Sequence, residues 1–143
     1  MPFSWSSNLE DVDWQELEAL YQAAPLGRKS ARDLEVVFTN SRFRCFVRDQ
    51  GRLVAVGRAL ADGADCSYIC DVAVLPGYQG TGLGKAVVQE LVKLSQGHKK
   101  IILYSVPGKE SFYKKLGFLR MLTAMAIFQD QGAAIQRGHV AED

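Results

Sequence analysis

The sequence predicts an α/β domain built around a mixed β-sheet, and three observations carry this prediction. Segments with apolar residues at helical spacing alternate along the chain with short runs rich in β-branched and aromatic residues. The run Tyr68–Leu75 is nearly all apolar, as expected for a central strand covered on both faces. A glycine-rich turn then joins this strand to an amphipathic helix, which is the strand–turn–helix order of α/β proteins.

The first quarter of the chain predicts a short strand and two helices. Phe3–Ser6 is the candidate strand. Asp13 is placed to cap the first helix, with Glu16 in the capping-box position, and Pro25-Leu26-Gly27 ends it. Ser30 is placed to cap the second helix. The apolar faces of the two helices contain Trp14, Leu17, Tyr21, Ala24, Leu34, Val37 and Phe38.

The middle of the chain predicts a hairpin and the central strand. Phe43–Val47 alternates as a strand does, Asp49-Gln50-Gly51 is a turn, and Leu53–Leu60 is the partner strand. Tyr68–Leu75 follows as the central strand.

The remaining third predicts two more helices and further strands. The helix after the glycine turn has an apolar stripe of Leu83, Val87, Val88, Leu91 and Leu94. Ile101–Tyr104 is a parallel strand, Gly108–Leu116 a short helix ended by Gly117, and Phe118–Phe128 the last one or two strands. With about four helices and 143 residues, the chain is expected to form one domain over residues 1–143, with 129–143 a partly ordered tail.

Composition excludes several classes of partner. The net charge of +1 does not favour nucleic acid or an anionic membrane surface, and no apolar run reaches membrane-spanning length. The N-terminus lacks the apolar core of a signal peptide. Two histidines and the cysteines Cys45, Cys66 and Cys70 form no metal-ligand spacing, so we expect no metal. Reduced thiols and a cytoplasmic location are the expectation.

The glycine-rich turn has the features of a phosphate cradle, because backbone N–H groups at a helix start bind anions and glycines allow close approach. A P-loop would need glycine and Ser/Thr where the chain has Gln79 and Ala86, and a dinucleotide fingerprint would need glycine at Lys85. The spacing Gln/Arg-x-x-Gly-x-Gly/Ala does fit, at Gln79, Gly82 and Gly84. The full candidate loop is Gln79, Gly80, Thr81, Gly82, Leu83, Gly84 and Lys85.

This loop resembles the pyrophosphate loop of the GNAT superfamily of N-acetyltransferases. Downstream, Phe112-Tyr113-Lys114-Lys115-Leu116-Gly117-Phe118 is similar to the F-Y-x-K-x-G-F element of the same family. The resemblance covers about residues 53–128. Cys70–Val74 and the YQG turn also resemble the plant and cyanobacterial serotonin-acetyltransferase-like branch.

The resemblance implies an acetyl-CoA-dependent enzyme that moves acetyl directly to a primary amine, carried by a small molecule or a peptide. Acetyl-CoA is then a co-substrate whose pyrophosphate lies on the loop from Gln79 to Lys85. The family's sheet is splayed at its centre. The splay would leave backbone groups of Val72, Ala73 and Val74 for pantetheine and the thioester oxygen.

Two side chains are candidates for proton transfer. The resemblance assigns Tyr113 as the general acid that protonates the leaving thiolate. Asp71 is the one acid in the apolar central strand, and burial disfavours a charged carboxyl group, which would favour it as base. Alternation places Cys70 and Tyr68 on the opposite face from Asp71. A structural aspartate bonded to an arginine such as Arg58, and a water wire in place of Asp71, remain alternatives.

Other questions remain open. A non-catalytic acetyl-CoA-binding regulatory module would keep the glycine loop and could lose the acid. The family often has asparagine and alanine where this chain has Val106 and Lys109, so the resemblance does not carry over the side-chain contact to CoA at these positions. Acceptor recognition is assigned to Pro25–Arg32, Tyr104 and Met121–Phe128. The sequence does not identify the amine, and a homodimer through the C-terminal strands rests on family analogy.

Overall fold

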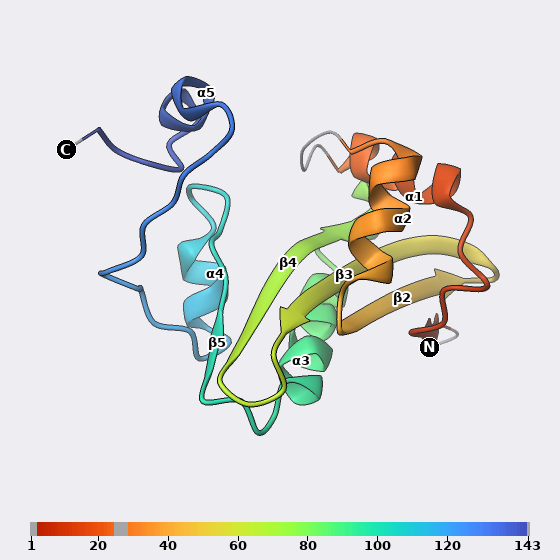
Figure 1. Ribbon diagram of the computed structural model, residues 1–143. Helices are drawn as coiled ribbons and strands as arrows, with labels where there is room; N and C mark the ends of the chain where they lie inside the picture. Colours follow the sequence, from red (N-terminus) through yellow and green to blue (C-terminus); the bar gives the residue numbers. More distant parts are fainter. Residues whose placement is uncertain (1–2, 25–28, 143) are drawn as a thin grey trace. The chain divides into compact units, whose positions relative to one another are not determined.

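The computed structural model describes residues 3–24 and 29–142. The chain forms two compact units, residues 1–103 and 104–143. The predicted helix stop at residues 25–27 lies outside the described residues. Figure 1 shows the order of the elements.

The first unit contains a five-stranded mixed sheet in the order β1-β2-β3-β4-β5. Its strands are β1 (Phe3–Ser6), β2 (Phe43–Asp49), β3 (Arg52–Ala61), β4 (Cys66–Val74) and β5 (Lys100–Ile102). Strands β1 to β4 pair antiparallel with one another in sequence, and β5 is parallel to β4. This confirms the predicted mixed sheet.

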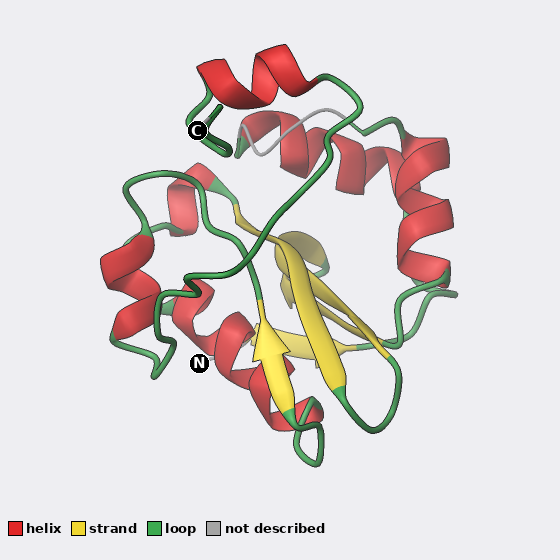
Figure 2. Cartoon of the chain, turned by 60° about the vertical axis from the view of Figure 1, so that its left-hand side comes forward, coloured by secondary structure: helices red, strands yellow, loops and turns green. Residues whose placement is uncertain are grey.

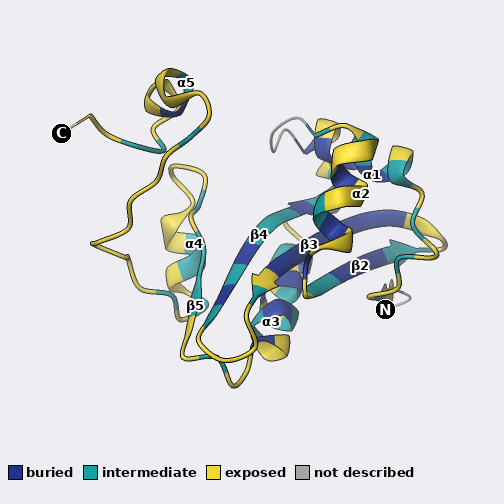
Figure 3. Ribbon diagram, in the orientation of Figure 1, coloured by how far each residue is buried: buried dark blue, intermediate teal, exposed yellow. Residues whose placement is uncertain are grey.

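Two helices cover one face of the sheet (Figure 1). They are α1 (Trp14–Ala23), capped by the side chain of Asp13, and α2 (Ala31–Thr39), capped by Ser30, as predicted. Their apolar faces pack on alternate residues of the sheet, and the core they form contains Leu17, Leu20, Tyr21, Leu34, Phe38, Phe46, Leu53, Val56 and Ala73. Figure 3 shows this burial in dark blue on the strands.

Helix α3 (Leu83–Leu94) covers the opposite face and packs against β2, β3 and β4. Leu83, Val87, Val88 and Leu91 are buried as the stripe predicts, whereas Leu94 is 38% exposed at the helix end. Gly57 in β3 lies under this helix. An added Cβ there would be 2.8 Å from both Leu91 Cδ1 and Val87 Cγ1, so α3 packs directly on the backbone of β3.

The central strand contains a β-bulge at Asp71. Arg58 is opposite Cys70, and Val56 is opposite Ala73, so Asp71 and Val72 together face the single residue Gly57. Asp71 has a φ of 55°, in the left-handed region that residues with a Cβ seldom occupy.

The bulge reverses which residues of β4 bond to β3. Before it, Asp62 N–H donates to the Cys66 carbonyl, so the even-numbered residues of β4 face β3 along the ladder. After it, Leu75 N–H donates to the Val54 carbonyl, so the odd-numbered residues do. The N–H groups of Val72 and Val74 therefore point to the other edge of β4.

That other edge of β4 is open. The parallel strand β5 pairs with β4 only over Cys66–Tyr68, and within residues 3–24 and 29–142 no strand pairs with residues 69–74 on that side. The predicted strand Ile101–Tyr104 is thus shorter and begins one residue earlier. The two strands part where the resemblance implied a splay.

The second unit has two short helices, α4 (Glu110–Lys114) and α5 (Gln131–Gln136). The prediction of one or two strands over Phe118–Phe128 is wrong: no strand is assigned to this segment, which Figure 2 draws as loop. Its interior is dominated by Leu, Met and Ala, which favour strands less than β-branched or aromatic residues do. The tail predicted as partly ordered contains α5, which Asp130 caps. The single domain over 1–143 stays a prediction.

Candidate active site

The glycine loop lies between the end of β4 and the start of α3, as predicted. Pro76–Tyr78 form a single 3-10 turn, η1. Gly80 and Gly82 then have φ values of 79° and 86°, so the chain turns through left-handed positions that glycine occupies without steric cost. Apart from the adjoining residues, nothing lies within 4 Å of a Cβ added at either glycine, so there is open space beside the turn.

The start of α3 is free of side-chain capping. Its N-cap residue is Gly82, which has no side chain to accept a hydrogen bond from the first turn. The first backbone hydrogen bond runs from Ala86 N–H to the Gly82 carbonyl. The N–H groups of Leu83, Gly84 and Lys85 therefore present the positive end of a 12-residue helix to whatever occupies the turn.

The side chain of Gln79 fixes the loop to the sheet. Its Nε2 donates to the carbonyl of Val74 at 3.0 Å. The Val74 carbonyl thus already accepts one hydrogen bond, and a carbonyl oxygen has a second lone pair, so its role toward pantetheine stays a prediction. Thr81 Oγ1 donates to the Tyr78 carbonyl at 2.5 Å and closes the turn.

Asp71 is surrounded by three side chains on the face covered by α1 and α2. Arg58 Nε donates to its Oδ2 at 2.8 Å, and Lys29 Nζ lies 3.4 Å from its Oδ1. The hydroxyl of Tyr21 donates to the backbone carbonyl of Asp71. Of these partners, Arg58 was anticipated from the sequence. Tyr21 and Lys29 were not, because nothing local in the sequence links them to residue 71.

The prediction that Cys70 and Asp71 point to opposite faces is wrong. Cys70 is the cross-strand partner of Arg58, so the two side chains share a face, and Arg58 binds the Asp71 carboxylate. The bulge is the reason: it adds one residue to β4 and interrupts the strict alternation of side chains. Burial raises the pKa of the Cys70 thiol, which is therefore not an activated nucleophile.

Tyr113 belongs to the second unit, in α4. Its ring makes edge contacts with Phe112 and Phe118, with centroids 5.0 and 5.9 Å apart. Burial raises the pKa of Tyr113, so the phenol stays protonated at neutral pH. Asp71–Val74 and the glycine loop therefore lie in the first unit, and Tyr113 lies in the second.

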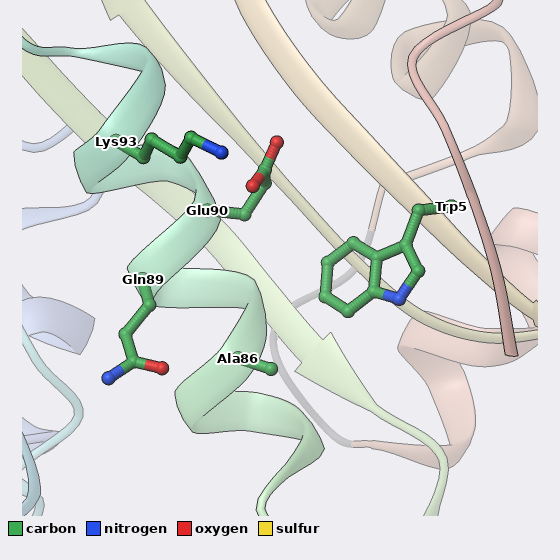
Figure 4. A pocket seen from close by; sticks show the side chains of 5 residues that line it. All are labelled: Trp5, Ala86, Gln89, Glu90 and Lys93. Carbon is green, nitrogen blue, oxygen red and sulfur yellow. The ribbon is translucent and has the colours of Figure 1, made fainter. Parts of the chain in front are cut away.

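Two shallow hollows lie along α3 in the first unit. One is lined by Trp5 and the exposed side of the helix, and Figure 4 shows its five lining side chains, Trp5, Ala86, Gln89, Glu90 and Lys93. The other extends to the glycine loop and is lined by Phe3, Trp5, Asp49, Gly77, Tyr78, Thr81, Gly82, Leu83 and Ala86. Neither contains Asp71.

Residues 3–24 and 29–142 contain neither a metal-ligand cluster nor a membrane-spanning helix. Among them, no cluster of three His, Cys, Asp or Glu side chains could hold a metal ion. No helix in residues 3–24 and 29–142 is long and apolar enough to cross a bilayer. The thiols of Cys45, Cys66 and Cys70 are free.

Comparison with known proteins identifies the family. The sequence model of the Acetyltransferase (GNAT) family matches residues 7–118. An uncharacterized N-acetyltransferase, ycf52, from Porphyra purpurea is 32% identical over 120 residues, covering 80% of this chain and 69% of that protein. Serotonin N-acetyltransferase 2, chloroplastic, from Oryza sativa subsp. japonica is 44% identical over 70 residues, covering 48% and 35%.

Solved structures show the same fold. A Staphylococcus aureus protein of unknown function aligns with a TM-score of 0.78 at 22% identity, covering 88% of this chain and 97% of that one. A Trypanosoma brucei acetyltransferase aligns with a TM-score of 0.70 at 26% identity, covering 88% and 99%. The fold and the glycine loop define an acyltransferase of the GNAT type. The chain belongs to the GNAT family of N-acetyltransferases.

Proposed function

We propose that this chain transfers acetyl from acetyl-CoA directly to a primary amine of a small molecule or peptide. One observation carries the proposal: an uncapped helix start at the glycine turn Gly80–Gly84 adjoins the open edge of β4. The family uses acetyl-CoA as co-substrate, and the residues present fit that group.

The pyrophosphate of CoA is assigned to the turn. Backbone N–H groups from Gln79 to Lys85 would bind it, supported by the helix dipole. The open space at Gly80 and Gly82 is consistent with a phosphate that approaches the backbone closely. The side chain of Lys85 would add a positive charge at the same place.

The thioester is assigned to the open edge of β4. The N–H groups of Val72 and Val74 point there, and backbone donors fixed in a sheet are suited to stabilise charge that develops on a carbonyl oxygen. Ala73 lies between them and packs into the core, so it holds the strand in place. Acetyl-CoA supplies the activated acyl group, and these residues orient it.

Two proton transfers complete the reaction. Tyr113 is proposed as the acid for the leaving thiolate. Its raised pKa makes the phenol a weak acid, so the transfer depends on position in the transition state. Asp71 as base for the amine stays a prediction. Its contacts with Arg58 and Lys29 weigh towards a structural role, which leaves water to accept the proton.

The compartment and assembly are also proposals. Free thiols are consistent with the predicted cytoplasm. The name of the rice relative makes a chloroplast the alternative. A homodimer is retained by family analogy alone.

A turnover screen tests the function. Purified protein and acetyl-CoA are mixed with a library of arylalkylamines, polyamines, aminoglycosides, amino acids and peptides, and release of CoA thiol is followed. Amine-dependent thiol release with matching N-acetyl product supports the proposal. Binding of acetyl-CoA without turnover of any amine would instead favour the regulatory module.

A further inference from the structure

The bulge in β4 is held in an unfavourable backbone conformation by its surroundings. Asp71 and Gln50 are the non-glycine residues with positive φ in the described part of the chain. Gln50 lies in an exposed hairpin turn, where such values are common, whereas Asp71 lies inside a central strand. A Cβ disfavours this conformation, so it persists only where neighbouring groups select it.

Side chains from three separate segments of the chain hold Asp71 in this backbone conformation. Tyr21 of α1 donates its hydroxyl to the Asp71 carbonyl. Arg58 of β3 binds the carboxylate, and its Nη1 also donates to Ser41 Oγ at 3.2 Å. Lys29, which precedes α2, lies on the second carboxylate oxygen. The backbone and side chain of Asp71 are thus fixed separately.

Tyr21 is a permanent donor in this arrangement. Its side chain is buried, with 3% exposure, and burial raises its pKa well above the ordinary value. The hydroxyl therefore remains protonated at every physiological pH. Without the Asp71 carbonyl, a buried hydroxyl would lose the partner it needs.

The direction of the Val72 and Val74 N–H groups depends on the bulge. A regular strand would continue the pattern set at Cys66, in which even-numbered residues bond to β3. The N–H groups of Val72 and Val74 would then donate hydrogen bonds to β3. The single extra residue turns both groups to the open edge.

We propose that Tyr21 and Asp71 are positioning residues of the acetyl-transfer site: they hold the left-handed bulge that directs the Val72 and Val74 N–H groups to the thioester. This inference rests on the proposed function. Neither side chain exchanges a proton with substrate in this role. Tyr21 acts through the Asp71 carbonyl, and Asp71 acts through its backbone conformation.

The first test separates positioning from base catalysis at Asp71. Asparagine tolerates the left-handed region and keeps an oxygen for Arg58, whereas valine is β-branched and disfavours it strongly. For positioning, Asp71→Asn keeps kcat within roughly threefold, and Asp71→Val loses at least about a hundredfold. A loss in Asp71→Asn as large as that in Asp71→Val, together with loss of the acid limb of the kcat/KM profile, would assign a base and overturn the proposal.

The second test removes only the hydroxyl that holds the bulge. Tyr21→Phe keeps the buried ring, and we expect kcat with acetyl-CoA and the best amine of the screen to fall at least about tenfold. The Kd for CoA, which lacks the acetyl carbonyl, should change less than kcat because the pyrophosphate loop is untouched. Leu17→Val is the matched control, since it perturbs the same helix and core but removes no hydrogen bond. Equal kcat in Tyr21→Phe and wild type would overturn the role of Tyr21.

A third measurement does not depend on turnover. Amide hydrogen exchange in the ligand-free protein should show Val72 and Val74 exchanging faster than Ala73, because only Ala73 bonds to β3. In Tyr21→Phe and Asp71→Val, this difference should shrink or reverse. An unchanged exchange pattern in both variants would overturn the proposal even if activity fell. If wild type acetylates no amine, the catalytic part fails with the proposed function, and exchange still reports whether Tyr21 sets the bulge.

Discussion

Tyr113 combines a protonated phenol with contacts that do not involve its hydroxyl. The ring is held by Phe112 and Phe118, so Tyr113→Phe keeps the packing and removes one oxygen. If this phenol is the acid, kcat falls roughly 10²–10⁴-fold, and the Kd for CoA is unchanged. Steady-state kinetics and calorimetry measure the two quantities.

The pH dependence gives an independent check on Tyr113. Because burial raises its pKa, kcat of the wild type should not decline through loss of this proton until the pH exceeds about 10. Tyr78→Phe is a control, since it removes a tyrosine hydroxyl that binds Asp49. A similar loss of kcat in Tyr113→Phe and Tyr78→Phe would show that a general loss of structure, and not the loss of an acid, is responsible.

The buried thiol of Cys45 should lower the free energy of unfolding at alkaline pH. Burial, followed by the nearby Glu90 carboxylate as the smaller cause, raises the pKa of this thiol from 9.0 to about 12. Below pH 9 the thiol is protonated in both states and has no effect. Above pH 9 the unfolded thiol ionises first, so the free energy of unfolding falls by up to about 1.4 kcal/mol per pH unit until the folded pKa is reached.

Denaturant unfolding of wild type and Cys45→Ala over this range tests the effect. The variant starts less stable because it lacks a buried side chain, but its stability should decline less steeply with pH between 9 and 10. Parallel curves would show that Cys45 ionises equally easily in the folded protein.

The glycine turn is an element whose function lies in its backbone. Gly82→Asp and Gly84→Asp each add a negative charge where the pyrophosphate is proposed to bind. A Cβ at Gly84 would make an ordinary contact with Val74 at 3.5 Å, so the fold of Gly84→Asp should be unaffected. Gly82 has a positive φ, so some backbone strain is expected in Gly82→Asp. We expect CoA affinity to fall at least tenfold, about 1.4 kcal/mol, in both. Calorimetry that shows unchanged affinity in both would exclude the loop as the binding site.

The contact between α3 and β3 depends on a missing side chain. Gly57→Ala places a methyl group 2.8 Å from Leu91 and Val87, which overpacks the interface and should cost about 1–3 kcal/mol of unfolding free energy. Gly77→Ala is the matched control, because nothing lies within 4 Å of its Cβ. Denaturant unfolding should therefore show a loss in the first variant alone.

At the scale of the whole molecule, local patterns predicted what depends on local contacts. Asp13 and Ser30 cap the two helices, and the stripe from Leu83 to Leu91 is buried, because capping and amphipathicity are properties of neighbouring residues. The bulge at Asp71 was not predictable. It depends on Tyr21, fifty residues away, and strict alternation then gave the wrong face for Cys70.

The second unit shows what local sequence could not predict, namely whether a segment pairs as a strand. A strand needs a partner, and the sequence of Phe118–Phe128 does not say whether one lies beside it. Within the described residues this segment pairs with no strand, and Leu119, Met125 and Ile127 are at least 90% exposed. The family element Phe112–Phe118 lies, as predicted, on α4 and the turn that follows it. The strands expected after it are not present in this segment.

Ligand binding should stabilise the molecule as a whole. If CoA binds only the folded chain, a free concentration of one hundred times Kd adds about 2.7 kcal/mol to the free energy of unfolding. For a chain of this length that corresponds to a rise in Tm of roughly 5–11 °C. Differential scanning calorimetry with CoA measures it, and Gly84→Asp should show a much smaller rise at the same concentration. A wild-type Tm that does not respond to CoA would mean that the glycine turn, although uncapped and open, does not bind the cofactor that its family uses.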